Sequence, residues 1–299
     1  MRNLLLDKKT RAALLPYTLI LPAFLVVFAL AAYGCFWLVR MSLVEIAFGA
    51  PWDRSTWVGL DNYRWLLFSE HSTFWESAKI TALYVAGTLL PELTLGMMLA
   101  LLLNQKIVGR SLYTAILLIP LVVMPSMVGM VWRLYFSYDG LVNFFVESLF
   151  GTKLNWYGPQ LALPAVIIVD IWEWTPFFVL ILLAGLQALP QEPFEAARVD
   201  GASGWQVFRY VTLPMLSPVI LTAAILRLMD ILRIFDVIYA MFGGGPGRAT
   251  TTLPLYIYRL TMVARNVGRG SAVSVMLILI ILSLTLVLVR FLESVKFEK

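Results

Sequence analysis

Six long apolar runs alternate with more polar segments along this chain of 299 residues. They cover residues 13–39, 80–103, 113–132, 161–186, 218–242 and 272–292. Each run is long enough to cross a hydrocarbon core of about 30 Å as a helix. The strands of a membrane barrel would instead alternate apolar and polar residues over about ten positions, and such segments are absent from the sequence. The pattern predicts an all-α polytopic membrane protein with six transmembrane helices.

The polar segment 187–214, between the fourth and fifth runs, has the pattern of a helix, a turn and a second helix. Pro193 suits a first helical turn, and Asp200-Gly201 is expected to end that helix. Ser203 and Gln206 have capping-box spacing, so a second helix should begin there. Pro214 is expected to close the unit before the next span begins. The same pattern is typical of an amphipathic connector that lies on a lipid surface.

Composition narrows the chemistry that this chain can perform. With 60% hydrophobic and 14% charged residues, the chain is too apolar for an ordinary soluble domain. The single cysteine excludes an internal disulfide, and the single histidine, His71 in a predicted loop, excludes a Ser-His-Asp triad or a histidine metal site within the membrane. A phosphate-binding Gly-Lys loop is missing, so the chain is not expected to hydrolyse ATP. Basic residues are scattered at span ends, which argues against a nucleic-acid partner.

The basic residues before the first apolar run suggest the topology. The first helix usually sets the orientation, so a cluster of lysines and arginines before it favours a cytoplasmic N-terminus. An even number of spans then returns the C-terminus to the same side. We therefore expect a cytoplasmic tail at 1–12, a transmembrane domain at 13–292 that includes the polar segment, and a cytoplasmic tail at 293–299. A short amphipathic helix is expected over 141–150, along the outer surface.

Three motifs in the polar segment carry a resemblance to a known family: Glu195-Ala196-Ala197, Asp200-Gly201-Ala202 and Leu213-Pro214. Their order and spacing resemble the cytoplasmic coupling loop of the permease subunits of ABC importers. The resemblance implies that this helix-turn-helix unit docks on a separate ATPase subunit and transmits its movement. The residues expected to couple to the ATPase are Glu195, Ala196, Ala197, Asp200, Gly201, Leu213 and Pro214.

Other segments resemble the carbohydrate branch of that family, which includes maltose, trehalose and glycerol-3-phosphate permeases. They are Val-Gly-Leu-Asp-Asn-Tyr at 58–63, Phe-Asp at 235–236, Gly-Gly-Gly-Pro-Gly at 243–247 and Ala-Thr-Thr at 249–251. The larger maltose permease subunit has eight spans and a large outer domain, whereas this chain resembles the common six-helix form.

The resemblance implies that this chain forms half of the pore of a transporter with several subunits. It implies a bacterial inner-membrane importer of a sugar, such as a disaccharide or related glycoside, delivered by an extracytoplasmic binding protein. A second homologous permease subunit would complete the pore. Two copies of a cytoplasmic ATPase subunit would bind ATP and Mg, so this chain itself is expected to be no enzyme and to bind no cofactor. The sequence leaves open which sugar is carried and whether the second permease is a different chain.

Charged residues inside the fourth and fifth runs are costly in a bilayer, so they are expected to face a cavity or a partner. Spacing of three residues allows Arg227 to pair with Asp230, and Arg233 to pair with Asp236. At 1.5 Å per residue, Glu173 and Asp230 lie about 18 Å from the ends of their runs, near the midplane. By resemblance, the substrate pathway is expected to include Asp170, Glu173, Trp174, Arg227 and Asp230. The alternative is that these charges pair within the helix bundle and never touch substrate.

Three other functions are compatible with parts of the pattern. An ion-coupled secondary carrier of a polar solute would use Asp170 and Asp230 as proton or cation relays, but it leaves the Glu-Ala-Ala motif unexplained. An intramembrane enzyme is disfavoured by the missing histidine and metal ligands. A non-transporting membrane scaffold is the third alternative.

Overall fold

Five long helices form the body of the computed structural model, which describes residues 8–105 and 107–297. They are α1 (Lys8–Ser42), α3 (Phe74–Leu103), α7 (Ala162–Gln187), α10 (Leu213–Ile231) and α13 (Val267–Phe297). The described part holds five helical stretches long and apolar enough to cross a membrane. A bent pair, α4 (Arg110–Val122) and α5 (Pro125–Tyr135), can provide a sixth. The predicted all-α fold class is confirmed. Parts of the two expected tails, residues 1–7 and 298–299, lie outside the described residues.

Shorter elements connect and cap the long helices. After α1, strand β1 (Val44–Glu45) pairs antiparallel with β2 (Thr56–Trp57), with the 3-10 turn η1 (Trp52–Arg54) between them and α2 (Asp61–Phe68) after them. Helix α6 (Leu141–Phe150) occupies the expected range. Between α7 and α10 come α8 (Glu192–Val199), α9 (Gly204–Val207) and the π-helical turn η2 (Phe208–Thr212). Before α13 come α11 (Asp236–Phe242), α12 (Leu253–Tyr258) and the π-helical turn η3 (Arg259–Val263).

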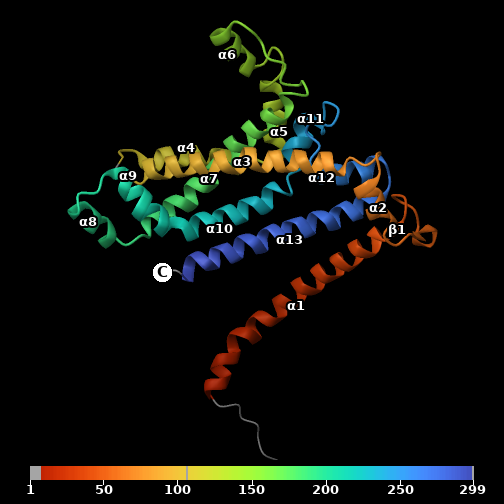
Figure 1. Cartoon of the computed structure of the whole chain (residues 1–299), viewed down its shortest axis with the longest axis horizontal. Helices are drawn as coiled ribbons and strands as arrows, with labels where there is room; N and C mark the ends of the chain where they lie inside the picture. Colours follow the sequence, from red (N-terminus) through yellow and green to blue (C-terminus); the bar gives the residue numbers. More distant parts are fainter. Residues whose placement is uncertain (1–7, 106, 298–299) are drawn as a thin grey trace, which may run out of the picture.

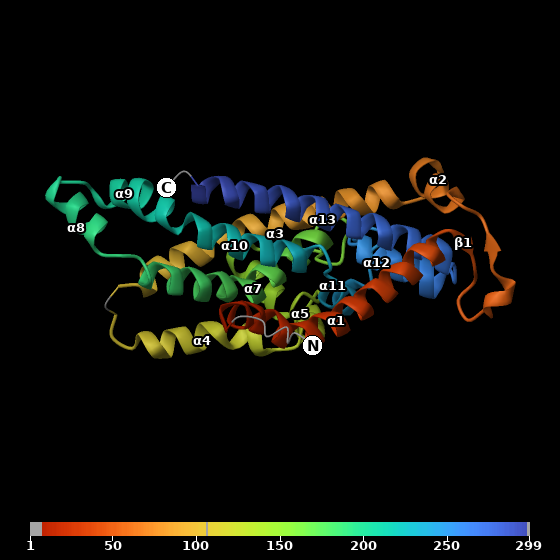
Figure 2. The same ribbon diagram turned by 90° about the horizontal axis from the view of Figure 1, so that it is seen from below.

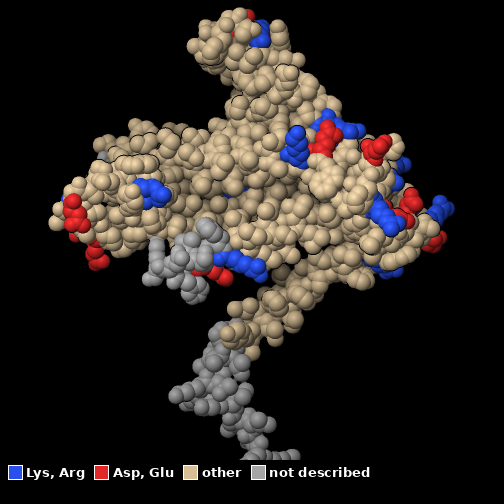
Figure 3. Space-filling model, viewed as in Figure 1, with Lys and Arg blue, Asp and Glu red and all other residues tan. Residues whose placement is uncertain are grey.

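The long helices define one axis of the molecule. Helices α3, α7, α10 and α13 run along it, while α8 lies at one end and β1 and α2 lie at the other (Figures 1 and 2). Helix α1 leaves the bundle on one side, and α5 and α6 project from the opposite side (Figure 1). On the face drawn in Figure 3, most charged side chains lie toward the two ends of the long axis or on the projecting part, and most of the surface between the two ends carries few charges. This distribution suits a protein whose middle lies in hydrocarbon.

The 58–63 motif ties the first helix to the rest of the bundle. Asn62 is buried, and its side-chain amide donates hydrogen bonds to the carbonyl of Ser42 at 2.9 Å and to that of Val44 at 3.0 Å. The hydroxyls of Ser42 and Tyr63 lie 2.6 Å apart. These contacts satisfy backbone groups where α1 ends, so the motif has a structural role at this point.

The expectation of one continuous helix over 113–132 is wrong, because the chain bends there. Helix α4 ends at Val122, helix α5 begins at Pro125, and the two axes differ by 96°. Val123 and Met124 between them are extended, with ψ values of 138° and 132°. A proline disfavours helical geometry at the preceding residue but suits the first turn of a new helix. Pro125 therefore separates the two helices.

The boundaries expected for the fifth span are also wrong. Pro214 does not close the polar unit, because the chain is helical without interruption from Gly204 to Ile231. The wider turn η2 shifts the hydrogen-bond register just before Pro214, and Leu213 donates to the carbonyl of Phe208. The helix then stops at Ile231 instead of reaching Phe242, and the charged residues beyond it lie in a break and in the separate helix α11.

Helices α3, α7 and α10 share a tight apolar core. Phe178 and Leu182 on α7 and Leu216 on α10 are fully buried in it. Gly96 of α3 faces Phe178 so closely that a Cβ atom there would collide with the Cβ of that phenylalanine. A small residue at this position lets the two backbones approach each other, as is common between helices in membranes.

We expect Gly96→Ala to destabilise the protein by about 1–3 kcal/mol, because the added methyl overpacks the contact with Phe178. The matched control is Gly34→Ala in α1, where a new Cβ meets nothing within 4 Å. Thermal unfolding midpoints of the two purified variants in the same detergent measure the difference. Equal midpoints would show that α3 and α7 do not need this close approach.

Candidate functional site

The polar segment between α7 and α10 forms a compact, capped unit. Pro193 lies in the first turn of α8, and Gly201 adopts a left-handed φ of 74° that favours glycine. Ser203 caps α9. Its hydroxyl oxygen accepts a hydrogen bond from the backbone N–H of Gln206 at 3.4 Å, and its own backbone N–H donates to the side-chain oxygen of Gln206 at 2.7 Å. The predicted helices and the capping box are therefore present, with the second helix continuing into α10.

This unit presents an exposed surface. No residue of α8 is buried, and Val199 is 87% exposed. Trp205 and Tyr210, on the following helical stretch, are 70% and 74% exposed. Exposed apolar and aromatic side chains on a rigid element are typical of a surface that binds another protein.

The motif residues divide between the two parts of the unit. Those of the first and second motifs lie on α8 and the turn after it. Glu195, Ala196, Asp200 and Gly201 are exposed, whereas Ala197 and Ala202 are half-buried. Leu213 and Pro214 are half-buried and begin α10, which places them on the span itself. The exposed unit and the membrane helix are consequently one continuous structure from Gly204 onward.

A second cluster, buried between the long helices, is centred on Arg227. Its guanidinium is 1% exposed and binds the Glu92 carboxylate through two hydrogen bonds of 2.8 Å each. It also binds Asp170 at 2.6 Å, and its Cζ atom lies 4.4 Å from the centre of the Trp174 ring. Because Glu92 is on α3, Asp170 on α7 and Arg227 on α10, one cation connects three helices.

The expected pairing of charges along the fifth run is wrong. Arg227 pairs with Glu92 and Asp170, whereas Asp230 pairs with Arg233 at 2.8 Å, on side chains that are 45% and 64% exposed. Asp236 forms no ion pair with Arg233, since α10 ends between them. Sequence reasoning missed Glu92. Its signal was present, however, because a carboxylate inside an apolar run needs a partner.

The five residues expected along a substrate pathway therefore lie in different surroundings. Asp170, Glu173 and Arg227 are buried, at no more than 2% exposure, while Trp174 and Asp230 are partly exposed. Among the described residues, one carboxylate oxygen of Asp170, one of Glu173 and the indole nitrogen of Trp174 lack a hydrogen-bond partner. Unpartnered buried polar atoms are uncommon in folded proteins and concentrate at functional positions.

Comparison with known proteins identifies the chain. Residues 92–296 match the family described as binding-protein-dependent transport system inner membrane component. The chain belongs to this family. It is thus a multi-pass permease component of the inner membrane and not an enzyme.

Named relatives match over most of their length. The trehalose/maltose transport system permease protein MalF of Thermococcus litoralis is 40% identical over 278 residues, which is 91% of this chain and 92% of that protein. The sulfoquinovosyl glycerol transport system permease protein SmoG of Agrobacterium fabrum is 33% identical over 94% of this chain and 91% of its own.

A solved structure shares the fold. A chain of a bacterial ABC transporter involved in the import of the acidic polysaccharide alginate superposes with a TM-score of 0.80 at 23% identity. The match covers 96% of this chain and 98% of the other. The expected membership of the ABC importer permeases is confirmed.

We expect Arg227→Met to destabilise the protein by about 3–5 kcal/mol, because it leaves Glu92 and Asp170 buried without a counter-charge. Arg233→Met is the matched control, since its partly exposed pair with Asp230 contributes about 0–1 kcal/mol. The thermal unfolding midpoint in detergent and the amount of protein in the membrane measure both variants. If Arg227→Met unfolded no earlier than the control, Arg227 would not hold the three helices together.

Proposed function

We propose that this chain forms half of the translocation pore of an ATP-driven importer for a carbohydrate. The observation that carries the proposal is the exposed, capped unit of α8 and α9, which continues without a break into the transmembrane helix α10. Such a unit can receive a displacement from another protein and pass it into the membrane. The named relatives, a trehalose/maltose permease and a sulfoquinovosyl glycerol permease, support a sugar or glycoside as the substrate.

In this mechanism the motor is a pair of separate ATPase subunits that bind ATP and Mg. Helix α8 docks on one ATPase, with Glu195 making a charge-assisted contact to a basic group. Movement of α8 is transmitted through α9 to α10. Arg227 then carries it to α3 and α7, because its ion pairs with Glu92 and Asp170 hold the three helices as one body. A second, homologous permease completes the pore, and an extracytoplasmic binding protein delivers the sugar.

The proposed orientation puts the coupling unit and both chain termini in the cytoplasm. The C-terminal end of α13 lies toward the same end of the long axis as α8 (Figures 1 and 2). Strands β1 and β2 and helix α2 lie at the other end, which would be the outer side. The basic residues before the first span support this orientation.

The ion pairs of Asp170 and Asp230 argue against an ion-coupled carrier. Asp170 is already bound to Arg227, and Asp230 is bound to Arg233 near the surface, so neither is an isolated acid within the bundle. Trp174 and Asp230 remain the pathway residues that a substrate could reach from outside the chain. A partly exposed aromatic ring and a carboxylate suit the apolar face and the hydroxyl groups of a sugar.

We expect Glu195→Ala to lower sugar uptake about tenfold or more, since one hydrogen bond to a charged group contributes about 1.5–3 kcal/mol. The matched control is Glu192→Ala, an exposed acid on the same helix but outside the motif. Uptake of radiolabelled trehalose or maltose is measured beside ATPase activity in membranes with equal amounts of permease. Loss of uptake with both variants alike, or with neither, would contradict a specific contact at Glu195.

We expect Asp230→Asn to change the half-saturating sugar concentration by about tenfold, which corresponds to one lost charge-assisted hydrogen bond. Complex yield should remain unchanged, because the ion pair with Arg233 is partly exposed. Competition between unlabelled sugars for uptake measures the change in preference. A fall in complex yield with unchanged preference would make Asp230 a structural residue.

A further inference from the structure

A separate cavity of about 960 Å³ lies between α5, α11, the glycine-rich loop 243–246 and the α12–η3 helix. The residues that characterise its wall are Arg133, Tyr157, Asp236, Tyr239, Tyr258 and Arg259. None of the five residues expected along the pathway lines it. Its volume is at the upper end of the range for small-molecule sites in proteins.

Flat aromatic faces form one part of the wall. The hydroxyl groups of Tyr239 and Tyr258 lie 3.2 Å apart, with ring centres 5.2 Å apart. Phe235 stacks on Tyr239 with an interplanar angle of 15°, which fixes the orientation of that ring. Tyr157 meets Phe242 edge to face at 5.4 Å. Supported tyrosine rings offer both an apolar face and a hydroxyl group to a ligand.

Charged side chains that can still form hydrogen bonds make up another part of the cavity wall. Within the described residues, the Asp236 carboxylate and the Arg133 guanidinium take part in no hydrogen bond or ion pair. Arg259 differs, since it donates to the carbonyl of Gly243 at 3.1 Å and braces the glycine-rich loop. Gly244 has a φ of 88°, and a Cβ atom there would meet the Arg259 guanidinium at 2.9 Å. The loop thus needs glycine where it passes that side chain.

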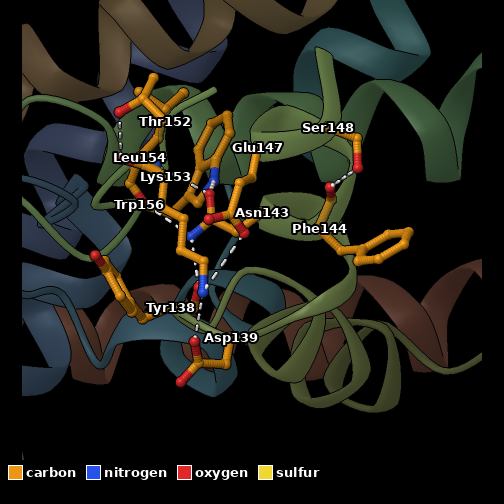
Figure 4. A network of polar contacts seen from close by, with 10 residues as sticks. All are labelled: Tyr138, Asp139, Asn143, Phe144, Glu147, Ser148, Thr152, Lys153, Leu154 and Trp156. Atoms are coloured by element: carbon orange, nitrogen blue, oxygen red, sulfur yellow. Dashed lines mark hydrogen bonds and ion pairs between the residues drawn. The ribbon is translucent and has the colours of Figure 1, made fainter. Parts of the chain in front are cut away.

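A buried polar network fixes the segment that carries Tyr157 (Figure 4). The Asn143 amide donates to the carbonyls of Tyr138 and Leu154, and its oxygen accepts from the Leu154 amide and the Trp156 indole, all at 2.9–3.1 Å. Trp156 packs on Phe136 with ring centres 4.8 Å apart. The next residue, Tyr157, donates its hydroxyl to the carbonyl of Arg133.

An ion pair outside the membrane spans strengthens this segment. Lys153 binds Asp139 at 2.7 Å, and this hydrogen bond raises the pKa of the Lys153 ammonium. The wall of the cavity is accordingly organised before any ligand arrives, which lowers the entropic cost of binding.

We propose that this cavity is a saccharide-binding vestibule, distinct from the pathway at Trp174 and Asp230. The proposal rests on the proposed function, in that the ligand is taken to be the transported sugar. Asp236 and Arg133 can each bind two neighbouring hydroxyl groups, while the tyrosine rings cover the apolar face of a sugar ring. Helix α11, which lines the cavity, follows the end of α10 and lies away from α8 (Figures 1 and 2), so a sugar arriving from the outer side meets this cavity first.

Cysteine labelling tests the vestibule directly. The chain has one cysteine, so Cys35→Ser gives a clean background for Ser126→Cys, a near-isosteric change in the cavity wall. Thr152→Cys is the matched control, because Thr152 is exposed close to the same segment but outside the cavity. Cells that contain the complete transporter are treated from outside with a membrane-impermeant maleimide, with or without trehalose or maltose, and with glycine betaine as the osmotic control.

Either sugar should slow labelling of Ser126→Cys by the factor 1 + [sugar]/Kd, so at ten times Kd by about tenfold. Labelling of Thr152→Cys should not change. Adding Tyr239→Ala should abolish this protection, and Tyr239→Phe, which keeps the ring, should retain most of it. No labelling of Ser126→Cys from outside, no protection by either sugar, or equal protection at both cysteines would overturn the vestibule.

Uptake of the same radiolabelled sugars is measured in the same cells, so the two proposals are tested separately. Uptake without protection would overturn the vestibule and leave the proposed function in place. Protection without uptake would support the vestibule as a sugar site and count against the proposed function.

Discussion

One buried guanidinium holds the centre of this protein together. Arg227 of α10 binds Glu92 of α3 and Asp170 of α7, and the three side chains are at most 1% exposed. In a medium of low dielectric constant an unpaired charge is very costly, so none of the three helices can rotate away without leaving a partner uncompensated. The apolar seam at Gly96 and Phe178 lies between two of the same helices and adds close packing to the ion pairs. The bundle is therefore restrained by charge and by shape together.

The apolar pattern predicted the fold class and the approximate position of the spans. Hydrophobic run length reports what can lie in a bilayer, and it does not report where a helix bends. The bend between α4 and α5 lies at Pro125, whereas Pro120 in the same apolar run lies inside α4 and does not interrupt it. Prolines were thus visible in the sequence, but only the surrounding structure decided which of them interrupts a helix. The stop at Ile231 was missed for a similar reason, because the apolar residues continue beyond it into α11.

The candidate site was predictable where its determinants are local. The capping box at Ser203 and the left-handed Gly201 depend on neighbours within a few residues, and both could be read from the sequence. The partners of Arg227 could not, because Glu92 is 135 residues away and faces it only after two helices have packed in one rotation. The cavity beside Tyr239 depends on segments from four elements. The motifs at 235–236 and 243–247 supply part of its wall, but neither motif predicts a cavity by itself.

The unbroken helix from Gly204 to Ile231 has a mechanical consequence. Twenty-eight residues at 1.5 Å each make a lever arm of about 42 Å, so a tilt of about 5° at one end shifts the other by about 4 Å. A displacement of that size exceeds the length of a hydrogen bond. In the proposed mechanism, a small tilt of the exposed end of this helix would therefore rearrange the contacts around Asp230 at its other end.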